Sequence, residues 1–253
     1  MESWINTWLS AAPNNFTFSI KVSRYITDYV GLKGQTAVQL WNKFSKTLDR
    51  ISEKIDFWLF KMPPSFKYTL ENLEIVRRFF NNIRLENNKA VIEFRHPSWW
   101  DVIDKIAEIG VIFCSVDAPG LPRSRIVTNN ALYLRVHGYK KWYSHIYSQE
   151  ELDTMISSVK KLDADKKAIY LNNDHGMLKN GLFSTSIDVP KPIVDVFVAA
   201  AASVVSVSGQ VSGCPIHICS TPAASAAAIV FTASIAFVPS TTSPMRERVD
   251  RFE

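Results

Sequence analysis

The chain has 253 residues, of which 47% are hydrophobic and 21% are charged, and its formal net charge at pH 7 is +5. A chain of this length and composition can bury a sizeable core, which excludes a wholly disordered protein. The mild positive charge favours anionic partners, but the sequence has no dense Lys/Arg tract of the kind that predicts a nucleic-acid-binding protein.

The cysteine content and the start of the chain predict a cytoplasmic protein. Three cysteines form an odd, scattered set rather than the framework of a disulfide-rich secreted protein. The opening MESWINTWLS lacks the basic and apolar regions of a signal peptide. The longest apolar stretch, at 223–238, is shorter than the roughly 20 residues that span a bilayer, so we expect no membrane partner.

Six short runs rich in Val, Ile, Phe and Tyr predict β-strands. They lie at 16–23, 57–62, 89–95, 111–117, 131–138 and 167–173. Between the first two runs, apolar residues from Val38 to Ile51 recur at helical spacing, and Leu152 to Leu162 do the same before the last run. Strand and helix therefore alternate, which predicts a parallel sheet that is either doubly wound or closed into a barrel.

The composition changes abruptly after residue 183. From Ser184 onward the chain is dominated by Ala, Ser, Val, Thr and Pro and is almost uncharged until its last few residues. We therefore predict an α/β domain at 1–183 and an atypical tail at 184–253 that is disordered, loosely packed or the result of a fusion.

The alternation of side chains along a strand divides each run into two faces. One face is apolar: Ile20, Val22, Trp58, Phe60, Ile92, Phe94, Ile112, Cys114, Val116, Leu132, Leu134, Val136, Ile169 and Leu171. The other is largely polar: Lys21, Ser23, Lys61, Glu93, Arg95, Ser115, Asp117, Tyr133, Arg135, His137, Tyr170 and Asn172. Because helices cover both faces of a doubly wound sheet, a polar face predicts a TIM-barrel-like fold with that face turned inward.

The charges of the polar face gather near the carboxyl ends of the runs, where barrel enzymes build their sites. Four of them are cations: Lys21, Lys61, Arg95 and Arg135. Their excess over carboxylates predicts a small phosphorylated or carboxylated ligand. Glu93, Asp117 and His137 are the candidate acid/base catalysts, because a carboxylate or imidazole in a partly dry pocket can be tuned for proton transfer.

Other interpretations of these residues stay open. The charges can form an internal ion network that binds nothing, since buried ions are normally paired. A divalent metal bound by Glu93, Asp117 and His137 is possible but not favoured, because the nearby arginines oppose it. No Walker loop or dinucleotide glycine fingerprint is present, so the cofactor is unknown. Aromatic residues in predicted loops, such as Trp142 and Tyr143, leave a nucleic-acid partner open without favouring it.

Several motifs in register resemble one known family. They are Lys21-Val-Ser-Arg24, Pro63-Pro-Ser-Phe66, Glu93-Phe-Arg-His-Pro-Ser-Trp99, Asp117-Ala-Pro-Gly120, Tyr133-Leu-Arg-Val-His-Gly138 and Tyr170-Leu-Asn-Asn173. Together they are similar to the YecE-like family, also called domain of unknown function 72, over about residues 1–183. The resemblance implies a TIM barrel and supplies no reaction. It implies binding or catalytic status for Lys21, Arg24, Glu93, Arg95, His96, Asp117, Arg135, His137, Asn172 and Asn173.

The chain departs from the family at both ends. The family's first two strands have no counterpart, so the six runs are expected to be strands three to eight, with two sheet edges left open for substitute strands or for oligomer formation. A run in the tail, at 193–207, is a candidate substitute strand.

The sequence leaves three hypotheses for the function. The protein is an enzyme that performs acid/base chemistry on a small anion, a non-catalytic module that binds an anion or nucleic acid, or an inactive truncated barrel.

Overall fold

A computed structural model describes residues 2–11, 17–83, 85, 90–173, 176 and 180, together with the backbone of 196–200 and 232–234. Six parallel strands pair in chain order. They are β1 (Phe18–Lys21), β2 (Ile55–Lys61), β3 (Ala90–Glu93), β4 (Ile112–Asp117), β5 (Ala131–Val136) and β6 (Lys166–Leu171). The predicted α/β class and parallel sheet are confirmed.

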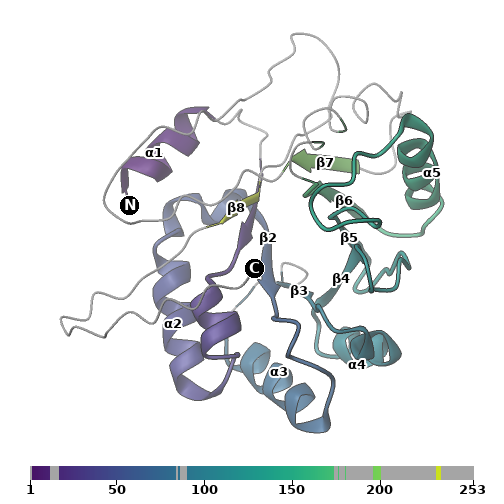
Figure 1. The fold of residues 1–253 in the computed structure, drawn as a ribbon. Coiled ribbons are helices and arrows are strands. Elements are labelled where there is room, and N and C mark those ends of the chain that lie inside the picture. The colour runs from purple at the N-terminus through teal and green to yellow at the C-terminus, as the bar shows by residue number, and fades with distance from the viewer. Residues whose placement is uncertain are drawn as a thin grey trace, which may run out of the picture.

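Helices follow most strands and lie on the outer side of a sheet that curls into a half-barrel (Figure 1). The α-helices are α1 (Glu2–Ala11), α2 (Gly34–Lys46), α3 (Leu70–Asn82), α4 (Ile103–Ala107) and α5 (Gln149–Lys160). The π-helix η1 (Tyr25–Tyr29) and the 3₁₀ helices η2 (Asp49–Lys54) and η3 (Pro97–Val102) complete the connections. This half-barrel is consistent with the predicted TIM-barrel-like fold, although the barrel is not closed.

Capping side chains mark the starts of two helices. Ser148 and Glu151 form a capping box that satisfies backbone N–H groups at the start of α5. The hydroxyl of Thr69 accepts a hydrogen bond from the backbone of Asn72 at the start of α3. The helical stripe predicted from residue 38 to 51 is divided between α2 and η2, and its member Ile51 is buried.

Two apolar clusters bury the outer face of the sheet under the helices. The first joins β1, β2 and β3 to α2, α3 and α4, with Trp41 and Phe60 among its buried residues. The second joins β5 and β6 to α5. Burial of apolar surface contributes roughly 25 cal/mol per Å², so both clusters stabilise the packing of the helices on the sheet. The predicted outward orientation of the apolar face is confirmed for β1, β2, β3, β5 and β6.

A third cluster lines the inner face and contains no residue from a helix. It consists of strand residues such as Leu59, Val91 and Tyr133, with Ala118 and Leu121 beside them. Strand β4 contributes Ile112, Cys114 and Val116 to this cluster. The prediction that Ser115 and Asp117 face the interior is therefore wrong, because the two faces of β4 are exchanged relative to it.

Two short strands from the predicted tail extend the edges of the sheet. β7 (Val196–Ala200) pairs in parallel with β6, and β8 (Thr232–Ser234) pairs in parallel with β1. β7 lies inside the run at 193–207, as the substitute-strand hypothesis requires. In the described strand order β7 and β8 are the two ends, so they do not pair with each other. The rest of the predicted tail lies outside the described residues.

No helix within the described part of the chain is long and apolar enough to cross a membrane.

Candidate functional site

The carboxyl ends of neighbouring strands bring ionisable side chains to one edge of the sheet. Lys21, Lys61 and Glu93 are the last residues of β1, β2 and β3, and Lys61 lies opposite Glu93 in the strand register. Arg135 lies one residue before the end of β5. Because all these strands are parallel, their carboxyl ends meet at the same edge. This is the edge where the sequence predicts a site.

Glu93 is fully buried at the centre of the group and accepts hydrogen bonds from two guanidinium groups. Arg135 Nη1 lies 2.6 Å from its Oε2, and Arg95 Nε donates to its Oε1. Burial by itself raises the pKa of Glu93, but Arg135 and then Arg95 hold that pKa well below its usual value. Glu93 is therefore a carboxylate throughout the physiological pH range.

Arg135 is held from two sides. Besides its bond to Glu93, its Nε and Nη2 donate to Asn172 Oδ1 at 3.1 and 2.8 Å. Burial lowers the pKa of Arg135, but the charge of Glu93, the electrostatic effect of Tyr133 and the hydrogen bond to Glu93 together outweigh burial and raise that pKa. With three hydrogen bonds in place, Arg135 is a fixed positive charge.

His137 completes the buried group. Its Nε2 lies 3.1 Å from Arg95 Nη2 and 3.6 Å from Glu93 Oε1. Burial, followed by the charge of Arg135, lowers the pKa of His137 to about 3, so the ring is neutral at pH 7. Since a guanidinium can only donate, Nε2 is the acceptor, which assigns the proton to Nδ1. Nδ1 is buried and has no hydrogen-bond partner within the described residues.

The loop after β5 folds tightly over this group. Arg95 lies over the ring of Trp142, with its Cζ 4.5 Å from the ring centroid, and it reaches the hydroxyl of Tyr143 at 3.5 Å. Tyr143 has a φ of 61° and donates its backbone N–H to the carbonyl of His137 at 2.7 Å. A left-handed backbone at a tyrosine is strained, which is common at binding sites. Gly138 (φ 98°) begins this loop.

Lys21 and Lys61 face the same edge but differ in their partners. Lys61 forms an ion pair with Asp28 of η1, with 3.1 Å between Nζ and Oδ2. Within the described part of the chain, no carboxylate forms an ion pair with Lys21. Burial, followed by the charges of Arg135 and Lys61, lowers the pKa of Lys21 to about 8. An internal ion network therefore accounts for Glu93 and its arginines but not for Lys21.

Asp117 belongs to a different group. It is fully buried, and Arg123 binds it in a bidentate manner at 3.0 and 3.1 Å. Arg125 Nη2 lies 3.4 Å from Asp117 Oδ2, and Arg125 Nε is buried with no partner among the described residues. The backbone carbonyl of Asp117 accepts a hydrogen bond from the N–H of His137 at 2.8 Å, but the side chain of Asp117 does not join those of Glu93 and His137. The signal that reveals these partners is the pair of arginines six and eight residues after Asp117.

The remaining predicted residues lie outside the buried group. Arg24 is exposed and donates to Tyr29 Oη at 2.9 Å. His96 Nδ1 lies 2.8 Å from Ser98 Oγ and caps the start of η3. Asn173 donates to the backbone carbonyl of His145 at 2.9 Å and to a second asparagine side chain at 2.7 Å, and its Oδ1 is buried with no described partner.

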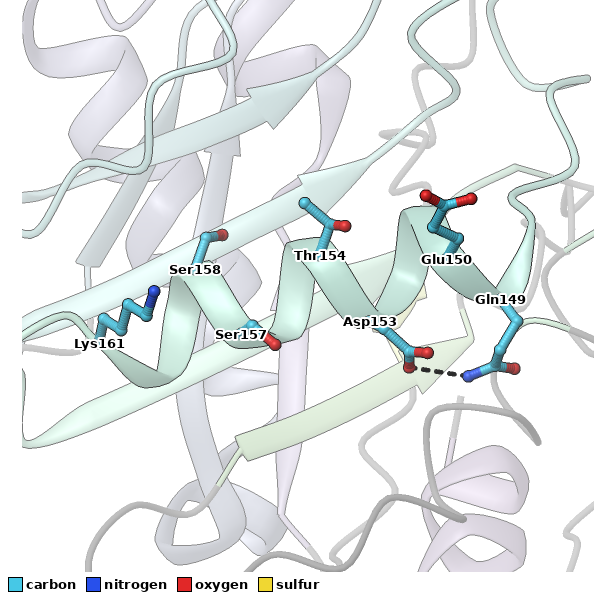
Figure 2. A pocket seen from close by; sticks show the side chains of 7 residues that line it. All are labelled: Gln149, Glu150, Asp153, Thr154, Ser157, Ser158 and Lys161. Carbon is cyan, nitrogen blue, oxygen red and sulfur yellow. Dashed lines mark hydrogen bonds between the residues drawn. The ribbon is translucent and has the colours of Figure 1, made fainter.

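A wide surface groove of about 860 Å³ lies elsewhere, along the exposed side of α5 (Figure 2). Its lining residues are Gln149, Glu150, Asp153, Thr154, Ser157, Ser158 and Lys161. None of them belongs to the buried group, so we place the candidate site at the sheet edge. Among the described residues, no group of three or more His, Cys, Asp or Glu side chains is arranged to hold a metal ion.

Comparison with known proteins assigns the family. The model of the family described as "Protein of unknown function DUF72" matches residues 1–179. The chain belongs to the DUF72 family. This confirms the resemblance found in the sequence, because YecE-like is another name for DUF72. No curated protein matches the chain.

Crystal structures of DUF72 proteins share the fold. One from Thermotoga maritima is 22% identical and has a TM-score of 0.64, with 73% of this chain and 78% of that chain covered. Another, from Enterococcus faecalis, is also 22% identical and has a TM-score of 0.61, with 76% and 84% covered. At this identity the likeness establishes the fold alone.

Proposed function

We propose that this DUF72 protein is an enzyme that binds a small phosphorylated or carboxylated metabolite at the carboxyl-terminal edge of the half-barrel and transfers a proton on it. The observation that carries the proposal is the convergence of ionisable side chains at that edge, with one cation, Lys21, unpaired by any described carboxylate. The proposal takes β1 to β6 as strands three to eight of the family's barrel, whose sites form at this edge.

The balance of charge supports an anionic ligand. At the inner edge four cations face two carboxylates, Glu93 and Asp28. The cations are Lys21, Lys61, Arg95 and Arg135. Leaving a buried or half-buried cation without a counter-ion is costly, and an anion at the site removes this cost. We assign Lys21, which has no described carboxylate partner, and Arg95, which also reaches Trp142 and Tyr143 of the loop after β5, as the ligands of the anion.

The contacts of Glu93 suggest how an anion activates it. Arg95 neutralises Oε1, and it is also the guanidinium that reaches the exposed ring of Tyr143. An anion that draws Arg95 toward itself removes one of the charges that lower the pKa of Glu93. Because Glu93 is fully buried, its pKa then rises, and the carboxylate becomes a base beside the neutral ring of His137. Asp117 takes no part in this proposal, because Arg123 and Arg125 hold it elsewhere.

Thermal-shift measurements with inorganic phosphate, sulfate and small carboxylates test the binding step. We expect concentration-dependent stabilisation, which reaches about 2.7 kcal/mol at a hundred times the dissociation constant. Lys21→Met and Arg95→Met should weaken it. The hits then define substrates for turnover assays, in which Glu93→Gln should abolish activity. If none of these anions stabilises the wild type, or if Glu93→Gln retains turnover, the proposal is wrong.

A further inference from the structure

Lys21 is set apart from the other cations of the site by its surroundings. Arg135 and Arg95 are bonded to Glu93, and Lys61 is bonded to Asp28. Lys21 ends β1, lies half-buried on the inner face, and pairs through its backbone with β2 and β8. Its amino group is thus positioned at the sheet edge without being tied to a carboxylate of the described residues.

The charged groups that face Lys21 come from four elements. Arg135 of β5 and Lys61 of β2 disfavour its ammonium form, whereas Glu93 of β3 and Asp28 of η1 favour it. Burial and the two cations prevail, and the pKa of Lys21 falls from 10.5 to about 8. A substantial fraction of neutral amine is therefore present near pH 8. Desolvation next to a second cation is one of the ways in which proteins activate a lysine as a nucleophile.

We propose that Lys21 is a covalent catalytic residue that forms a Schiff base with its substrate, which is therefore an anion bearing an aldehyde or ketone group: an oxo acid or a phosphorylated aldehyde or ketone. This inference rests on the anion site proposed above and names its substrate class. The neighbouring cations serve both steps, because they raise the fraction of neutral amine and attract the anionic group of the substrate.

The chemistry balances without any oxidant or reductant. The neutral amine of Lys21 attacks the carbonyl carbon, a C–N bond forms, and the electron pair of the C=O bond moves to the oxygen, which takes up a proton. Nitrogen loses a proton to give a neutral carbinolamine. A proton on its hydroxyl group then allows the C–O bond to break and water to leave as nitrogen forms the double bond. The sum is an amine, a carbonyl compound and one proton giving an iminium ion and water.

Reductive trapping tests this step on the full-length chain. The protein is incubated at pH 8 with sodium cyanoborohydride and, in turn, pyruvate, glyoxylate, 2-oxoglutarate, glyceraldehyde 3-phosphate, dihydroxyacetone phosphate and the neutral ketone hydroxyacetone. Peptide mapping by mass spectrometry locates the adducts. The exposed Lys33 is the internal reference. We expect at least one anionic carbonyl compound to modify Lys21 more than about tenfold faster than Lys33. The neutral ketone should show no such preference.

Two further measurements separate reactivity from folding. Lys21→Arg keeps the positive charge at the end of β1 and should abolish the adduct, and its melting temperature without ligand shows whether the variant folds as the wild type does. In the wild type, the rate at which trinitrobenzenesulfonate modifies Lys21 should level off above about pH 9, because most of the amine is then neutral. The rate for a lysine of ordinary pKa, about 10.4, still rises at that pH, so a Lys21 rate that rises just as steeply contradicts the proposal.

The outcomes distinguish the two proposals. Selective adduct formation at Lys21 supports the Schiff base. Stabilisation by the anionic carbonyl compounds without selective modification of Lys21 overturns the Schiff base and leaves the anion site standing. Absence of stabilisation by any anion, with Lys21 no more reactive than Lys33, overturns both.

Discussion

Replacing Glu93 by glutamine removes the charge that holds two buried arginines while keeping the shape of the side chain. Arg135 and Arg95 donate to different oxygens of Glu93, and their side chains are only 7% and 9% exposed. Breaking a buried ion pair by removing one partner costs about 3–5 kcal/mol. For a protein of this size, 1 kcal/mol shifts the melting temperature by roughly 2–4 °C. Glu93→Gln should therefore lower the melting temperature by about 6–20 °C.

The matched control is Glu74→Gln in α3. Glu74 forms an ion pair with Arg78 at 2.7 Å, but the two side chains are 46% and 75% exposed. Exposed pairs contribute less than about 1 kcal/mol. Urea unfolding at pH 7 measures both variants. If Glu93→Gln destabilises the protein no more than Glu74→Gln does, the argument that the charge of Glu93 secures the arginines is refuted.

The pH dependence gives the same prediction a second test. The pKa of Glu93 is held well below 4.5 in the folded protein. Its charge therefore stabilises the fold fully above pH 4.5, and this stabilisation is lost as pH falls through the folded pKa. The difference in unfolding free energy between wild type and Glu93→Gln should be constant from pH 7 to about 5.5 and narrow below about pH 4.5. A difference that is independent of pH down to pH 2 contradicts the assignment.

Two further predictions concern the same region. The pKa of His137 is about 3 in the folded protein, against 6.5 for the ordinary group, so the unfolded state binds the proton first and stability falls as pH decreases from 6.5 toward 3. In His137→Gln the unfolding free energy should therefore depend less on pH between 6.5 and 5. An unchanged pH dependence in this variant refutes the lowered pKa. A Cβ at Gly138 would lie 2.7 Å from a backbone oxygen, whereas Gly110 (φ 82°) has open space around it. Gly110→Ala should cost about 1–2 kcal/mol for backbone strain alone. Gly138→Ala should cost more in urea unfolding, and equal costs would show that the loop after β5 is not tightly held.

The predictions about faces show where sequence reasoning succeeds. In β3 and β5 the side chains alternate between apolar and charged, and the structure places Ile92 and Leu134 under the helices and Glu93 and Arg135 together on the inside. The alternation suffices there because the polar side chains have their partners on the same inner face, where Arg135 of β5 reaches Glu93 of β3 across β4.

The same reasoning fails for β4. Ser115 accepts a hydrogen bond from the backbone N–H of Ile126 at 2.8 Å, and Asp117 binds Arg123 and Arg125. The polar side of β4 therefore faces a loop that supplies its partners, and the apolar side, with Cys114, fills the interior. Polarity along a strand does not reveal whether the partners of a polar side chain lie inside the sheet or in a covering loop.

By itself the sequence determined the family, the parallel α/β architecture, the two helical stripes and the membership of Glu93, Arg95, Arg135 and His137 in one inward group. These follow from periodicities and motifs that are local in the chain. Only the tertiary structure decided that Asp117 is held apart and that Lys61 is paired with Asp28 while Lys21 is not paired with any described carboxylate. It also decided that segments about 30 and 210 residues away in the chain pair with β6 and β1. Such choices depend on distances between residues remote in sequence, and it is these distances that set the pKa of each group.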